Sequence, residues 1–236
     1  MDGEREYSRA ELAGLLEWWV DAGVDVAVQE APRDWLKPAA PPAPAPESVA
    51  IANVAEPSHD TLAELRDWLA SSVQLPLASA TAQRILPHGP EDAAVMLLSD
   101  APALEDFASA QPIGGEAWTL AGKMLAAIGI PIDEAYSASL SCFHAPGSRM
   151  SEAERAACAD IARKHIALVK PKRLLLLGDG PCRALLSEPL IAARGRAHRI
   201  EGVRTVATFH PRMLMKRPSD KAKAWADLLL LMEDEV

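Results

Sequence analysis

The 236-residue sequence has little of what marks a secreted or membrane protein. Its three cysteines, Cys142, Cys158 and Cys182, are too few and too scattered for a disulfide framework. No apolar run approaches the roughly 18 residues that a membrane span needs. The N-terminal stretch MDGEREYSRAEL is too acidic and polar for a secretory signal. We therefore expect a cytoplasmic protein with no membrane partner.

Aromatic residues are also scarce, at 5%, yet 49% of the residues are hydrophobic and 24% are charged. A chain of this composition can bury a sizeable core and is not disordered overall. Its length allows one large domain or two small ones.

Basic residues are outnumbered over the whole chain, which carries a net charge of −9, but they are unevenly placed. Residues 1–140 hold 7 basic and 22 acidic residues, whereas residues 141–223 hold 17 basic and 7 acidic residues. This asymmetry predicts an electropositive face on an acidic protein, which suits a polyanionic partner. A solvated helix surface is the alternative interpretation.

The beginning of the chain differs in composition from the rest. Residues 8–22 place leucines and Trp19 at helical spacing, and residues 37–48 read KPAAPPAPAPES, which is typical of an extended, semi-rigid linker. We predict a helical extension over residues 1–36, an Ala/Pro-rich linker over 37–58 and a single domain over 59–236.

Short apolar runs alternate with helical patterns in the predicted domain. The expected strands are residues 94–98, 135–140, 173–177 and 204–208, and the expected helices are residues 60–70, 116–128, 151–169, 181–186 and 220–231. Such alternation favours an α/β fold with three layers, in which helices cover both faces of a mainly parallel four-stranded sheet.

In an open α/β sheet the ligand site lies beyond the carboxyl ends of the strands. Asp100 follows the first expected strand and His210 follows the last. Basic residues lie in the same or nearby segments, namely Arg149, Arg212, Lys216, Arg217, Lys221 and Lys223. An acid and a histidine beside phosphate-binding cations suit hydrolysis at a nucleotide. The alternative interpretations are that Asp100 only forms a turn or caps a helix, and that His210 is a loop histidine bound by the backbone.

Residues 93–231 resemble the uracil-DNA glycosylase superfamily, in particular its family-four bacterial members. The segment 208–218, TFHPRMLMKRP, is similar to the family pattern T-[YF]-H-P-x-x-L-[LM]-[RK]-x-P, and Trp225 to Leu228 follow it as W-A-D-L. Residues 146–149, PGSR, are similar to P-G-N-R. The resemblance implies a DNA repair enzyme with the three-layer fold, acting as a monomer on DNA.

The resemblance also implies roles for particular residues. Asp100 would orient water or stabilise the sugar cation, and His210 would donate to the oxygen of the departing base. The base pocket would comprise Ala101, Pro102, Ile113 and Ser139. DNA would be bound through Arg149, Pro211, Arg212, Lys216 and Arg217.

The sequence departs from the family pattern at several of these positions. Ile113 stands where the family has the phenylalanine that stacks on uracil, and Ser139 where it has the asparagine that reads the base edge. Cys158 matches one cysteine position of the family's iron–sulfur cluster, but Phe143 stands at the preceding one and Cys142 is one residue away from it. Two candidate thiolates cannot hold a four-cysteine cluster, so we predict neither a metal site nor an iron–sulfur centre.

Three functional hypotheses follow. The first is a DNA glycosylase that releases uracil or a related damaged base, with Asp100 and His210 as its machinery. The second is a catalytically silent homologue that binds DNA. The third is an unrelated doubly wound enzyme that holds a nucleotide cofactor at the Gly178–Gly180 turn, although this turn lacks the complete dinucleotide or P-loop motif.

Overall fold

The computed structural model describes residues 60–78, 82–144 and 150–233. All of them belong to the second of two units into which the chain divides, Met1–Ala50 and Ile51–Val236. The predicted N-terminal helical extension and linker, and Arg149, lie outside the described residues. The domain boundaries predicted for residues 1–58 therefore stay a prediction.

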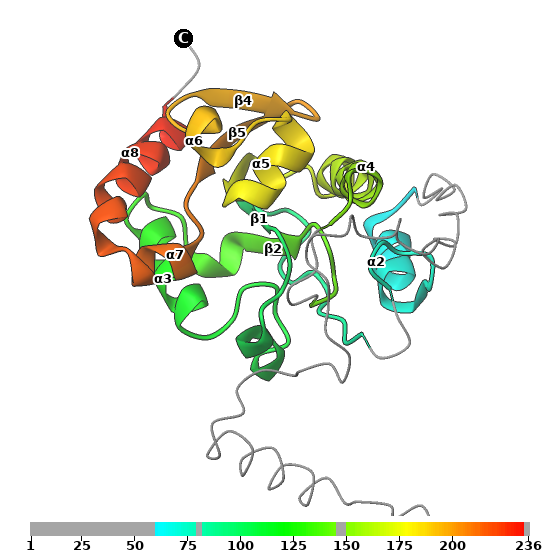
Figure 1. Ribbon diagram of the computed structural model, residues 1–236. Coiled ribbons are helices and arrows are strands. Elements are labelled where there is room, and N and C mark those ends of the chain that lie inside the picture. The colour runs from blue at the N-terminus through cyan, green and yellow to red at the C-terminus, as the bar shows by residue number, and fades with distance from the viewer. Residues whose placement is uncertain (1–59, 79–81, 145–149, 234–236) are drawn as a thin grey trace, which may run out of the picture. The chain divides into compact units, whose positions relative to one another are not determined.

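A five-stranded sheet lies at the centre of the described unit (Figure 1), in the spatial order β2-β1-β3-β5-β4. Its strands are β1 (Val95–Ser99), β2 (Ala135–Ser139), β3 (Arg173–Leu177), β4 (Ala197–Ile200) and β5 (Val203–Thr208). The pairs β1–β2, β1–β3 and β3–β5 are parallel, and β4 is antiparallel to β5. The four parallel strands are those that the sequence predicts.

Helices cover both faces of the sheet, which confirms the three-layer α/β/α architecture. The α-helices are α2 (Leu62–Ser71), α3 (Gly115–Ala126), α4 (Glu152–Val169), α5 (Asp179–Leu186), α6 (Leu190–Ala193), α7 (Pro211–Lys216) and α8 (Lys221–Met232). The described residues also form three short 3-10 helices, η1 (Leu104–Ala108), η2 (Ile132–Glu134) and η3 (Pro218–Asp220). None of the helices in the described part of the chain is both long and apolar enough to cross a membrane.

Alternation along the strands divides the core into two clusters. In β1, Met96 and Leu98 pack with α4, α5 and α6 on one face, whereas Val95 and Leu97 pack with α3 and α8 on the other. All five residues of β1 are buried, as expected for a central parallel strand covered on both sides. A third cluster joins α2 to α4 through Leu65 and the fully buried ring of Phe143.

The prediction of four strands is corrected by β4. This four-residue strand, AHRI, lies at the edge of the sheet, and only Ile200 is buried in it. A half-exposed edge strand lacks the continuous apolar run that reveals the central strands.

Candidate active site

The loops that follow the four parallel strands meet at one edge of the sheet. Because β1, β3 and β5 are neighbours, Asp100, the Gly178–Gly180 turn and His210 come after adjacent strands. Ser139 ends β2 on the other side of β1. The structure therefore places the acid and the histidine that the sequence predicts at the same edge of the sheet, after strands separated by β3.

Asp100 lies directly against the start of α5. A Cβ atom at Gly180 would overlap Asp100 Cγ and come within 2.7 Å of its Oδ2, so only glycine leaves room for the carboxyl group here. Although Asp100 is exposed, loss of surrounding water raises the pKa of its carboxyl group, and the negative charge of Asp179 raises it further. Arg155, at the start of α4, opposes the rise. Asp100 is thus a better proton acceptor than an ordinary aspartate.

The same contact bears on a nucleotide cofactor at the Gly178–Gly180 turn. The carboxyl group of Asp100 occupies the space beside Gly180, and Asp179 is the first residue of α5. Two acidic groups at this helix start repel a phosphate, although a helix N-terminus otherwise favours one. The geometry therefore argues against this hypothesis.

His210 is held in one orientation as the N-cap of α7. Its Nδ1 accepts a hydrogen bond of 3.1 Å from the backbone N–H of Arg212. An acceptor Nδ1 requires the proton of the neutral ring to be on Nε2. Burial lowers the pKa of His210 to about 4, and the neighbouring Arg212 charge acts in the same direction, while Glu105 opposes it. At neutral pH the ring is therefore an uncharged Nε2–H donor.

A buried ion pair supports the end of β5 just before His210. Asp227 on α8 is 1% exposed and accepts hydrogen bonds from Thr208 Oγ1 at 2.7 Å and from Arg194 Nε at 2.8 Å. The Arg194 guanidinium also lies 4.3 Å from the ring centroid of Phe209. These contacts fix the two residues that precede His210. Burial raises the pKa of the Asp227 carboxyl, although its donors oppose this.

Hydrogen bonds within the loop between β1 and α3, together with ion pairs from α7, hold this loop in place. Asp106 is fully buried, and its two oxygens accept the backbone N–H groups of Ala103 at 2.7 Å and Gly114 at 2.6 Å. Arg212 forms ion pairs with both Glu105 and Asp106. Since Arg212 comes two residues after His210, these ion pairs connect the loops that follow β1 and β5.

The predicted base-pocket residues lie in different environments. Ser139 is half-buried, and its hydroxyl donates to the carbonyl of Ser141 at 2.7 Å. Ala101 is half-buried, and Pro102 is buried beside His144. Ile113 has no exposed surface and packs in the core cluster beneath α3. A role for Ile113 against a base stays a prediction, and this burial gives it no support.

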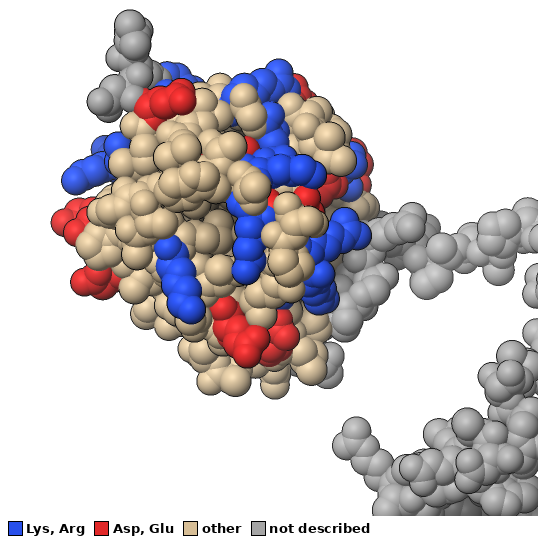
Figure 2. All heavy atoms as spheres, turned by 90° about the vertical axis from the view of Figure 1, so that its left-hand side faces the viewer, with Lys and Arg blue, Asp and Glu red and all other residues tan. Residues whose placement is uncertain are grey.

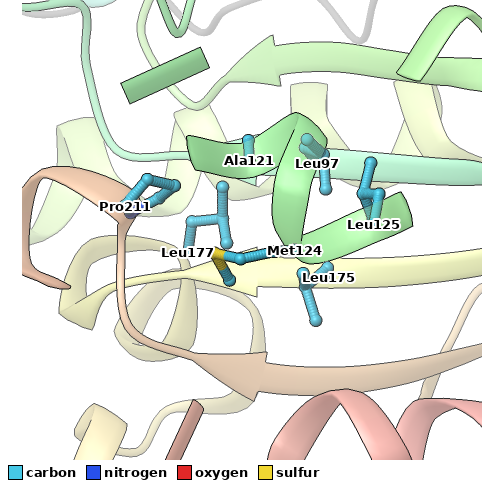
Figure 3. A pocket seen from close by; sticks show the side chains of 7 residues that line it. All are labelled: Leu97, Ala121, Met124, Leu125, Leu175, Leu177 and Pro211. Atoms are coloured by element: carbon cyan, nitrogen blue, oxygen red, sulfur yellow. The ribbon is translucent and has the colours of Figure 1, made fainter. Parts of the chain in front are cut away.

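Two of the residues predicted to contact DNA, Pro211 and Arg212, have side chains that already make contacts within the protein. Pro211 is buried and lines a small apolar cavity of about 10 Å³ together with Leu177 and Met124 (Figure 3). Arg212 has its side chain 17% exposed because of its two ion pairs. Their predicted contacts with DNA stay untested, but neither side chain is presented to solvent as a phosphate ligand would be.

Lys216 and Arg217, at the end of α7, are exposed. Within the described part of the chain, neither has a carboxylate within 4.0 Å. Figure 2 shows basic side chains running down the face formed by α3, α7 and α8, beside a hollow. The hollow has a volume of about 220 Å³ and is lined by residues that include Lys123, Lys221 and Trp225. Part of the predicted electropositive face is therefore present.

The cysteines do not suit a four-cysteine cluster. The chain has three, and all are buried. Phe143, at the position where the resemblance places a cluster cysteine, is a core residue, and Cys182 belongs to α5. No group of three or more His, Cys, Asp or Glu side chains suited to a metal ion occurs among the residues that the structure describes. The side chains present do not fit an iron–sulfur centre.

Two half-buried aromatic side chains near the site were missed by sequence reasoning. Phe107 in η1 and His144 after β2 meet edge to face, with ring centroids 6.0 Å apart and an interplanar angle of 82°. His144 belongs to the segment that follows the second strand, where the sequence does place a candidate loop. Phe107 lies between the first expected strand and the next expected helix, where no motif or spacing distinguishes it.

The comparisons with known proteins agree with this arrangement. The family model of the uracil DNA glycosylase superfamily matches residues 86–229. The type-4 uracil-DNA glycosylase of Pyrobaculum aerophilum is 23% identical over 180 residues, which cover 72% of this chain and 92% of that protein. That of Archaeoglobus fulgidus is 22% identical over 141 residues, which cover 55% of this chain and 71% of that protein. With the family model covering more than half of its length, this chain belongs to the uracil-DNA glycosylase superfamily.

Proposed function

We propose that this protein is a DNA N-glycosylase that extrudes uracil or a related damaged base from DNA and releases it by hydrolysis. The observation that carries the proposal is the state of His210, a neutral Nε2–H donor on the loop after β5, two strands away from Asp100. The type-4 names of the two relatives support the same chemistry.

The reaction breaks the bond between C1′ of the sugar and a ring nitrogen of the base. The base takes the bonding electrons, so negative charge develops on its oxygen as it departs. The ring of His210 is neutral, and its Nε2–H donates a hydrogen bond to this oxygen. This hydrogen bond stabilises the negative charge as it develops. One such donor is typically worth about 3 kcal/mol in the transition state.

Water supplies the oxygen that replaces the base at C1′. The Asp100 carboxylate orients this water and accepts its proton as the new C–O bond forms. The same negative charge favours the cation-like sugar of the transition state. Burial and the charge of Asp179 raise the pKa of Asp100, which makes its carboxylate a stronger base toward this water.

We further propose that the protein acts as a monomer, without an iron–sulfur centre, and that the exposed Lys216 and Arg217 contact DNA phosphates. Phosphate contacts of this kind position a protein on DNA without reading its sequence. Base selection then depends on the loops after β1 and β2.

Single-turnover incubation with an oligonucleotide that carries one uracil, followed by alkaline cleavage at abasic sites, tests the proposal. We expect the wild type to produce cleaved strands and Asp100→Asn and His210→Ala to lose this activity while remaining folded. His198→Ala is the matched control, because His198 lies on edge strand β4, where its Nε2 is 2.8 Å from the carbonyl oxygen of Ala193. Equal activity in His210→Ala and His198→Ala would refute the role of His210.

A catalytically silent DNA-binding homologue is the second candidate. Two observations favour it: the Ser139 hydroxyl already donates to the Ser141 carbonyl, and Ile113 is buried. At these two positions the family has the residues that read the base edge and stack on the base. This candidate predicts salt-dependent DNA binding with no abasic product from uracil or from a panel of other damaged bases.

A further inference from the structure

The site described above has an acid and a donor, but it needs an aromatic face for the extruded base. Bases that leave the DNA stack are held between aromatic or apolar side chains in the enzymes that act on them. Ile113 is buried, and the Phe209 ring has the Arg194 guanidinium over one face. Tyr136 and Phe143 are fully buried. The half-buried pair Phe107 and His144 is the aromatic surface on the described loops after β1 and β2.

Phe107 is held firmly although it lies in a loop. Its neighbour Asp106 closes the loop by binding the backbone N–H groups of Ala103 and Gly114. A Cβ atom at Gly114 would lie 3.1 Å from Asp106 Cα and would overlap Ser109 Oγ, so the loop is packed tightly. Arg212 adds its two ion pairs from α7. The backbone that carries Phe107 is therefore fixed in place before a ligand binds.

His144 is fixed by a hydrogen bond to the loop that follows β1. Its Nδ1 lies 2.7 Å from the carbonyl oxygen of Pro102, and since a carbonyl only accepts, the proton is on Nδ1. Pro102 comes two residues after Asp100, and the Ser141 N–H donates to the Asp100 carbonyl at 3.1 Å. The imidazole is thus tied to the segment that carries the acid, and its ring meets Phe107 edge to face.

We infer that Phe107 provides the face on which the extruded base stacks and that His144 is the positioning residue that holds its ring. This inference rests on the proposed function and names the residue that takes over base stacking where Ile113 cannot. A packing role alone would need apolar volume at position 107, whereas stacking needs a π face. The two roles therefore respond differently to leucine.

Binding to an uncleavable probe separates stacking from catalysis. The probe is a single-stranded oligonucleotide with one central 2′-fluoro-2′-deoxyuridine, and the reference is the same strand with 2′-fluorothymidine at that position, so the two strands differ only in the base. The Kd for the reference strand divided by the Kd for the probe measures base recognition alone, and a larger ratio means stronger preference for uracil. We expect Phe107→Leu and Phe107→Ala each to reduce this ratio by roughly 5- to 150-fold, the range for loss of one base–aromatic stack. Phe107→Tyr should keep the ratio within about threefold of the wild type.

Two further variants complete the test. His144→Asn keeps a side-chain N–H for the Pro102 carbonyl but removes the ring, so it should lower the ratio less than Phe107→Ala does. Trp225→Ala is the aromatic control, because this residue is 44% exposed on α8 and lines the hollow beside the basic side chains, where its loss affects the binding of both strands equally. It should leave the ratio unchanged. Thermal unfolding confirms that each variant is folded.

The outcomes separate the two proposals. A wild type that discriminates, together with a Phe107→Leu variant that discriminates equally well, overturns the stacking role and leaves the glycosylase proposal intact. A wild type that binds both strands equally refutes uracil recognition, and the stacking inference falls with it. Loss of the ratio in Phe107→Leu with retention in Phe107→Tyr supports the inference.

Discussion

Replacement of Asp227 by alanine tests the buried ion pair that supports the end of β5. Asp227 is 1% exposed, and its carboxylate has three side-chain donors, Thr208 Oγ1 at 2.7 Å and Arg194 Nε and Nη2 at 2.8 Å each. Removing one partner of a buried pair leaves the other charge without compensation and costs about 3–5 kcal/mol. Arg194 is 16% exposed and keeps its contact with the Phe209 ring, so we expect the lower end, about 3 kcal/mol.

A loss of about 3 kcal/mol in a domain of this size corresponds to a fall in Tm of about 6–12 °C. Urea and thermal unfolding, followed by circular dichroism, measure the free energy of unfolding of Asp227→Ala, Arg194→Ala and the double variant. Because the two side chains contact each other, the double variant should be more stable than the sum of the single effects predicts, by about 1–3 kcal/mol. Additive effects, or a loss below about 1 kcal/mol for Asp227→Ala, would refute this account of the pair.

Three shorter predictions concern protonation, a close contact and an ion pair. Burial lowers the pKa values of His165 and His210 to about 3 and about 4. The unfolded chain therefore takes up these protons first as the pH falls below 6.5. We expect the free energy of unfolding in urea to fall by about 2 kcal/mol per histidine from pH 7 to pH 5, and a flat profile would contradict this. Gly180→Ala should displace the Asp100 carboxyl group and reduce the single-turnover rate of base release by about a hundredfold. Gly122→Ala is the control, because its Cβ would make only ordinary contacts, from 3.6 Å. It should stabilise α3 by about 0.5–1 kcal/mol and leave the rate unchanged. Arg212→Ala should cost about 2 kcal/mol in urea unfolding without changing the salt dependence of DNA binding, and a shallower slope would show that this side chain contacts phosphate.

The central fold follows from the sequence because the two central strands β1 and β3 are visible as short apolar runs and helical patterns separate the strands. Residues 173–177, RLLLL, coincide with β3, and the helix expected over residues 151–169 coincides with α4, where Ser151 and Glu154 form a capping box. The fold elements that were missed are short. The helix α7 has six residues and begins with a proline, so it is too short for a helical pattern to show in the sequence.

The position of the site also follows from the sequence, since parallel strands end at a common edge. Its internal contacts do not. Arg212 finds its acidic partners more than 100 residues earlier in the chain, and nothing in its local sequence distinguishes it from Lys216. A resemblance identifies Ile113 as the counterpart of a stacking residue, but burial of its side chain is a property of packing. Only the fold shows that Phe107 and His144 meet.

The distribution of exposed charge is also only partly predictable from the sequence. The excess of basic residues in 141–223 predicts a broad electropositive face, but several of these arginines bind backbone carbonyl oxygens or buried acids instead. Arg163, Arg173 and Arg204 donate to the carbonyls of Leu185, Leu231 and Leu230. Since an arginine with its donors directed inward contributes little to phosphate binding, the attraction for DNA must depend on fewer, exposed cations than the net charge implies. For the DNA glycosylase proposed above, so few phosphate contacts contribute little affinity, and selectivity then has to come from the groups that hold the base.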